Sequence, residues 1–210
     1  MRKFLLIALL AALCCNGVLA QDDDNYDRPN RIAIGPKAGV GLAMGSHSAA
    51  QNLDFKMGLA YQAGAAFNAH FGRRYSSSDG GTGWFAIEIE AMYSGRGIKL
   101  GSDKINMSCI EVPVLAQLYV IPTFAVEAGA TMVKVLRTSP AQIISDGVTY
   151  NVGDIKGSDV MATLGLCYKT PTGIMVDARY NLGLSPLAGN FDTKVSTFMV
   201  SFAYLFNIVK

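Results

Sequence analysis

The chain has 210 residues, of which 50% are hydrophobic, and its formal net charge is only +2. This length suits a single domain, and the charged share of 16% lies below the ~25% typical of soluble domains. A weak positive charge without a Lys/Arg run excludes a nucleic-acid partner that is recognised through its phosphates.

The first 20 residues have the three parts of a secretory signal peptide. Arg2 and Lys3 precede an apolar run over 4–15, and Val18-Leu19-Ala20 resembles a cleavage site. The run is too short to span a membrane as a helix. A lipoprotein leader is the second interpretation, because two cysteines follow the apolar run. With cleavage after Ala20, residues 21–31 form an acidic flexible tail and 32–210 form one domain.

The rest of the chain is dominated by alternation of apolar and polar residues, which is typical of β-strands. About eight segments show it: 32–44, 57–71, 84–94, 105–120, 124–136, 159–169, 174–184 and 195–210. They are longer than the ~5–6 residues of an average soluble strand. In the last segment one parity carries Phe198, Val200, Phe202, Tyr204 and Phe206. We expect this row to face lipid.

The opposite parity combines glycines with charged residues. The charged set is Lys37, Glu88, Glu90, Glu111, Glu127, Asp177 and Arg179. Glycines weaken a strand whose face meets water, whereas the lumen of an eight-stranded barrel is only wide enough for side chains to fill. We therefore expect the charged set to form an ionic network inside a barrel.

Two further features favour a membrane barrel over a soluble one. Aromatic residues lie near segment ends, as in interfacial girdles: Phe71, Phe85, Tyr93, Tyr119, Phe124, Tyr168 and Phe206. The segments also reach the ~9–11 residues that a tilted membrane strand needs. The sequence thus predicts an all-β, eight-stranded antiparallel up-and-down transmembrane β-barrel. The alternative is a secreted soluble barrel or sandwich, such as a lipocalin-like barrel that binds a small apolar ligand.

The connections between the segments alternate in length. Those at 121–123 and 170–173 are tight and contain proline, while 139–158 is long and rich in Gly, Asp and Ser. This asymmetry is typical of outer-membrane barrels, which have short periplasmic turns and longer external loops. The connection at 73–83 departs from it, because it is long and falls on the periplasmic side.

No catalytic, cofactor-binding or metal-binding residue is predicted. Ser46, His47, Ser48 and Asp54 have the residue types of a hydrolase but lack a nucleophile motif. The two histidines lie far apart in sequence, and no Cys/His cluster suggests zinc. Cys109 and Cys167 are expected to face inward at opposite ends of the barrel, too far apart for a disulfide.

The motifs resemble those of the Bacteroidetes outer-membrane β-barrel family that includes PorT-like proteins. They are GPKAGVGLA, GLAYQAGAAFN, IEIEAMYSGRGIK, EVPVLAQ with the following EAG, and GIMVDARYNLGLSPL. The resemblance implies a location in the outer membrane and contact with its lipid and with the barrel-assembly machinery. PorT-like members are implicated in type IX secretion. We expect a structural or interaction role, with external loops open to other envelope proteins; the alternative is a small pore or transport protein.

Overall fold

A computed structural model describes residues 31–47, 55–74, 83–100, 103–121, 123–139, 142–145, 148–151, 157–170, 172–184 and 193–209. Within these ranges no helix is long and apolar enough to cross a membrane. The predicted signal peptide and acidic tail lie outside the described residues, except for Arg31.

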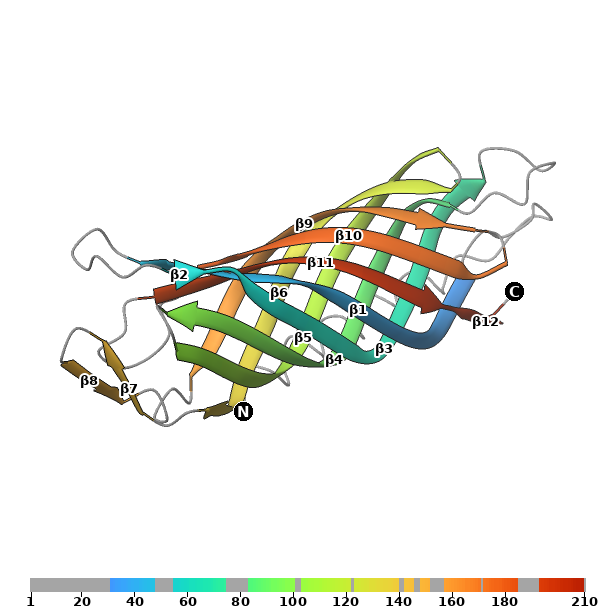
Figure 1. Ribbon diagram of the computed structural model, residues 1–210. Helices are drawn as coiled ribbons and strands as arrows, with labels where there is room; N and C mark the ends of the chain where they lie inside the picture. The colour runs from blue at the N-terminus through green and yellow to red at the C-terminus, as the bar shows by residue number, and fades with distance from the viewer. Residues whose placement is uncertain are drawn as a thin grey trace.

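Eight long strands run around one sheet (Figure 1). They are β1 (Arg31–His47), β3 (Gly58–Arg74), β4 (Gly83–Leu100), β5 (Asp103–Ile121), β6 (Phe124–Ser139), β9 (Ser158–Lys169), β10 (Ile174–Gly183) and β11 (Thr193–Tyr204). Each strand pairs antiparallel with the next, and β11 pairs with β1, for example at Val40 and Val200. The sheet therefore closes into a barrel, which leaves its long strands without exposed edges and confirms the predicted fold.

Four short strands supplement the barrel. The first, β2 (Phe55–Lys56), pairs with the end of β4, while β7 (Gln142–Ser145) and β8 (Val148–Asn151) form a separate hairpin. The last, β12 (Phe206–Val209), follows β11 after a break at Leu205 and pairs with the start of β1. The strands β2, β7 and β8 were not predicted, and β11 and β12 were predicted as the single segment 195–210.

The break at Leu205 is fixed by the turn between β9 and β10. The backbone N–H of Leu205 donates to the carbonyl of Gly173 at 2.8 Å. Gly173 has a φ of 95°, a conformation that residues with a Cβ rarely adopt. Leu205 itself is buried and continues the inward row of Ser201 and Ala203, so alternation of the two faces persists across the break.

The outer face of the barrel is apolar. Phe198, Val200, Phe202, Tyr204 and Phe206 lie on it with exposed fractions between 40% and 57%. Alternating neighbours of these residues, such as Ser201 and Ala203, are buried. The soluble alternative needed this aromatic row in a core, so the structure rules that alternative out.

One residue of the predicted aromatic girdles lies on the wrong side. Tyr119 is buried in the lumen, where its ring centroid lies 5.0 Å from that of His70. It has the parity of Gln117, which is also buried, so alternation along β5 assigns it to the inside. Tyr93 and Tyr168 are exposed on the outer face, as expected.

The lumen is packed in three layers. An apolar layer near the long connections contains Ala43, Ala60, Ile98, Ile105, Met107, Cys109, Val133, Val135, Met161, Val195 and Met199. A second apolar layer near the tight turns contains Ala33, Ala66, Ala86, Tyr119, Ala125, Cys167, Met175, Ala203 and Leu205. Between them lies a band of buried polar and charged side chains.

Candidate functional site: the polar lumen

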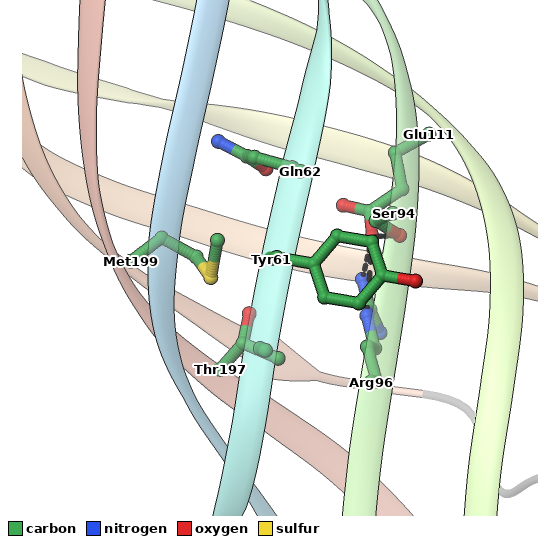
Figure 2. A pocket seen from close by; sticks show the side chains of 8 residues that line it. Tyr61, Gln62, Ser94, Arg96, Glu111, Thr197 and Met199 are labelled. Atoms are coloured by element: carbon green, nitrogen blue, oxygen red, sulfur yellow. Dashed lines mark hydrogen bonds and ion pairs between the residues drawn. The ribbon is translucent and has the colours of Figure 1, made fainter.

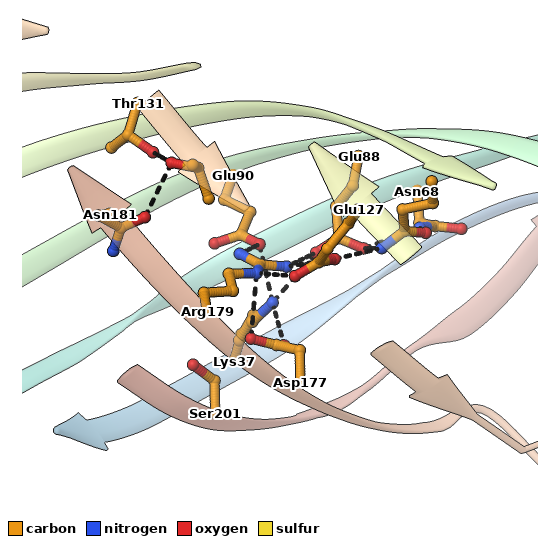
Figure 3. Close-up of polar contacts among 12 residues, drawn as sticks. Lys37, Asn68, Glu88, Glu90, Glu127, Thr131, Asp177, Arg179, Asn181 and Ser201 are labelled. Atoms are coloured by element: carbon orange, nitrogen blue, oxygen red, sulfur yellow. Dashed lines mark hydrogen bonds and ion pairs between the residues drawn. The ribbon is translucent and has the colours of Figure 1, made fainter. Parts of the chain in front are cut away.

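A cluster of six ionisable side chains occupies the middle of the lumen (Figure 3). None of the six is more than 3% exposed. They project inward from four strands: Lys37 from β1, Glu88 and Glu90 from β4, Glu127 from β6, and Asp177 and Arg179 from β10. We call these six residues the central network.

Lys37 joins three carboxylates of the central network. Its Nζ lies 3.1 Å from Glu88 Oε1, 2.8 Å from Glu90 Oε1 and 2.5 Å from Asp177 Oδ2. The side chain is completely buried, so the compensation of its charge comes from these carboxylates rather than from water.

Arg179 contacts all four carboxylates. Its guanidinium lies 2.9 Å from Glu88 Oε1, 2.5 Å from Glu90 Oε1 and 3.1 Å from Asp177 Oδ1, and it also pairs with Glu127. A planar group with five donors can serve several acceptors at once, which a lysine cannot do with the same geometry.

Gly165 provides the space for this side chain. It pairs with Arg179 in the β9–β10 register, and a Cβ built on it would overlap Glu127 Oε1 and Arg179 Cγ. The glycine is therefore explained by close packing against the central network, as expected for glycine on the crowded inner face of a small barrel.

Neutral amides donate further hydrogen bonds to two carboxylates of the central network, Glu88 and Glu127. Asn68 Nδ2 donates to Glu88 Oε2 at 2.8 Å, and Gln117 Nε2 donates to Glu88 Oε2 at 3.0 Å and to Glu127 Oε2 at 3.1 Å. The sequence analysis did not include these two amides. Their parity, shared with His70 and Tyr119, was the signal that could have found them.

The carboxylates of Glu88 and Glu90 differ in their partners. Both oxygens of Glu88 accept hydrogen bonds, from Lys37 and Arg179 at Oε1 and from the two amides at Oε2. Glu90 Oε1 accepts from Lys37 and Arg179, but Glu90 Oε2 is buried and has no partner among the described residues. The central network thus holds four carboxyl groups and two basic groups, and the carboxyl group of Glu90 is less fully hydrogen-bonded than that of Glu88.

This difference predicts unequal effects of two matched substitutions. Glu88→Gln places an amide NH₂ against donors at either oxygen position, so we expect it to lower the free energy of unfolding by ~1–3 kcal/mol. Glu90→Gln can turn its NH₂ to the unpartnered side, so we expect a change below ~1 kcal/mol. Denaturant unfolding in lipid vesicles measures both. A Glu90→Gln variant as unstable as Glu88→Gln would contradict this assignment.

Glu111 lies apart from the central network, in contrast to the prediction of a single cluster. Its carboxylate pairs with Arg96, whose Nη2 lies 2.6 Å from Oε1, and it also accepts from Ser94 (Figure 2). These side chains lie beside Gln62 and Met199. Alternation predicts that Glu111 faces inward, but its height along the barrel depends on the strand register, which alternation does not give.

A third polar group lies beside Asn68. Lys169 Nζ is 3.1 Å from Asn68 Oδ1 and 2.6 Å from His70 Nε2. His70 was expected to be a polar residue near a lumen end, and the structure buries it there. Lys169 was not expected in the lumen, although it shares the parity of the buried Cys167.

The remaining candidates are the metal-binding residue types, the two cysteines and the group at 46–54. Among the described residues, no group of three or more His, Cys, Asp or Glu side chains is arranged to hold a metal ion. Cys109 and Cys167 are buried free thiols in different apolar layers. Ser46 and His47 end β1, whereas Ser48 and Asp54 lie outside the described residues.

A family model described as the outer membrane protein beta-barrel domain matches residues 19–189. The chain belongs to this family. The match and the apolar outer face together identify it as a small outer-membrane β-barrel protein. Strands β11 and β12 lie beyond the matched residues, and they complete the barrel in the structure.

Solved outer-membrane barrels resemble the fold at low sequence identity. Neisserial surface protein A has a TM-score of 0.52 and 10% identity, covering 82% of this chain and 97% of its own. Ail of Yersinia pestis has a TM-score of 0.47 and 15% identity, covering 84% and 99%. The outer-membrane enzyme PagL has a TM-score of 0.41 and 12% identity, covering 79% and 98%. A search of curated protein sequences gives no significant match.

Proposed function

We propose that this outer-membrane barrel is a closed, non-enzymatic protein with a structural or interaction role. The observation that carries the proposal is the packing of the lumen. A buried ionic network fills its middle, and an apolar layer lies on each side of that network. Such a barrel presents its ends, rather than its interior, to other molecules.

The arrangement of the connections supports binding at one end. β5 and β6 are joined through 122–123, and β9 and β10 through 170–173, both at the same end of the barrel. The opposite end carries β2 and the β7–β8 hairpin (Figure 1). By the rule of short periplasmic turns and long external loops, we assign the end with the hairpin to the cell exterior. Other envelope proteins are the partners that we propose for it.

A small pore is the alternative that this packing opposes. Among the described residues, the central network and the two apolar layers fill the lumen and leave ions no aqueous path between them. We expect no steady single-channel conductance after reconstitution into planar bilayers. A steady current that recurs with independent protein preparations would overturn the proposal in favour of transport, provided that a boiled sample gives no current.

We also propose a more specific family and route to the membrane. The motifs quoted above support the PorT-like branch of the Bacteroidetes barrels and, through it, a link to secretion. The residues at 1–20 support export through a signal peptide, followed by insertion with the barrel-assembly machinery and contact with outer-membrane lipid. Loss of secreted cargo on deletion, restored by the wild-type protein, is the result expected for a secretion role.

A further inference from the structure

Glu90 has one buried oxygen that the central network does not compensate. The residue is 2% exposed. Its Oε1 accepts hydrogen bonds from Lys37 and Arg179, whereas its Oε2 has no partner among the described residues (Figure 3). An ionised carboxylate spreads its charge over both oxygens, so ionised Glu90 would bury part of that charge away from any donor.

The other three carboxyl groups of the central network have compensation at both oxygens. Glu88 and Glu127 each accept hydrogen bonds at Oε1 and at Oε2. Each oxygen of Asp177 lies against a cationic nitrogen, at 3.1 Å for Oδ1 and 2.5 Å for Oδ2, although neither contact has the geometry of a hydrogen bond. Within the network, Glu90 is therefore the group whose surroundings favour a negative charge least.

The groups around Glu90 also contain more acids than bases. Its charged neighbours are Lys37 on β1, Glu88 on β4, Glu127 on β6, and Asp177 and Arg179 on β10. The other four strands place neutral side chains beside them: Asn68 on β3, Gln117 on β5, Cys167 on β9 and Ser201 on β11.

Two further basic residues of the lumen have partners of their own. Arg96 pairs with Glu111, and Lys169 contacts Asn68 and His70. Two basic groups thus face four carboxyl groups in the central network. A buried charge that is not compensated is so costly that an ionisable group becomes neutral instead. A proton is the simplest ligand that removes such a charge.

Protonation of Glu90 keeps every hydrogen bond that it makes. The proton binds to Oε2, and Oε1 remains the carbonyl oxygen that accepts from Lys37 and Arg179. A buried hydroxyl without an acceptor still costs free energy, but much less than a buried ionised oxygen without a donor. The geometry therefore selects both the residue and the oxygen.

We propose that the central network is a proton-binding site and that Glu90 carries the proton at neutral pH. A glutamic acid in water is ionised above about pH 4.3, so the unfolded chain releases the proton that the folded barrel holds. Raising the pH from there disfavours the folded barrel, until the folded barrel itself releases the proton. The surrounding pH thus regulates how firmly the lumen stays closed. This inference goes beyond the proposed function and holds for either orientation of the barrel.

The test is the infrared spectrum of the full chain in vesicles of an ether-linked lipid, which has no ester carbonyl to cover a carboxyl band. A protonated carboxyl group gives a C=O stretch above the amide band, and a carboxylate does not. We expect this stretch in the wild type at neutral pH and its loss in Glu90→Gln. The matched control is Glu111→Gln, outside the central network, which should keep the stretch.

Denaturant unfolding in the same vesicles provides a second readout, the dependence of stability on pH. Between pH 6 and pH 9 the unfolding midpoint of the wild type should fall more steeply than that of Glu90→Gln, because glutamine has no proton to release. Glu111→Gln should follow the wild type. A shift in gel mobility between unboiled and boiled samples verifies folding. A wild type without the stretch at neutral pH, or equal pH slopes for the wild type and Glu90→Gln, would overturn the inference.

Discussion

Replacing Arg179 with alanine is expected to lower the free energy of unfolding by ~3–5 kcal/mol, the usual cost of removing one partner from a buried ion pair. Arg179 contacts Glu88, Glu90, Glu127 and Asp177. After its removal, Lys37 is the remaining cation of the central network, and its ammonium group contacts Glu88, Glu90 and Asp177 rather than Glu127. Denaturant unfolding of the barrel in lipid vesicles measures the change.

Two further variants show whether the loss of stability comes from the central network or from removing any arginine side chain. Arg137→Ala removes the same type of side chain from an exposed position and is expected to change the free energy of unfolding by less than ~0.5 kcal/mol. Arg179→Lys keeps the charge but not the planar set of donors, so we expect an intermediate loss. Equal stability of Arg179→Ala and Arg137→Ala would show that the central network does not stabilise the barrel.

Introducing arginine at Val200 is expected to cost ~2–4 kcal/mol in a bilayer, the usual penalty for a cation on the lipid-facing surface near the membrane centre. Val200 lies on the outer face, 43% exposed, and pairs with Val40 and Ala178 in the middle of the adjoining strands. Equilibrium unfolding from vesicles gives the value. Val200→Leu, which keeps the site apolar, is the control and should match the wild type.

Ser201→Arg provides the complementary test on the inner face. Ser201 is buried, accepts a hydrogen bond from Gln62 and lies against Gly39, where a Cβ would overlap its Oγ. The lumen has no room for an arginine there, so we expect this variant to fail to fold. If Val200→Arg were as stable as Val200→Leu while Ser201→Arg folded normally, the inside and outside of the barrel would be exchanged.

Much of the fold follows from alternation alone. Residues such as Val200 and Ser201 differ in burial because neighbouring side chains on a strand point to opposite faces, and this rule predicted the eight long strands and the inward direction of the charged set. It did not predict β2, β7 and β8. These strands have 2, 4 and 4 residues, too few to show a convincing period.

The polar lumen was less predictable than the fold. Alternation gives the face of a residue but not its height, which depends on the stagger between strands. Glu111 and Glu127 both face inward, yet one pairs with Arg96 and the other with Arg179. Asn68, Gln117 and Lys169 join the lumen networks as hydrogen-bond donors, which a pattern of opposite charges does not predict for neutral amides or for a lysine near a turn. The alternation along their strands nevertheless places all three side chains on the inner face.

The most direct test of the account concerns the surroundings of the aromatic row on β11. Trp84 is the single tryptophan of the chain, so Trp84→Phe/Phe202→Trp moves the fluorophore to a position that is 55% exposed in the middle of that row. The variant is reconstituted into vesicles whose lipids carry bromine on the acyl chains. We predict strong quenching of its emission relative to vesicles of unbrominated lipid, because the side chain at position 202 touches hydrocarbon. Emission that is the same in both vesicles would contradict the lipid-facing barrel.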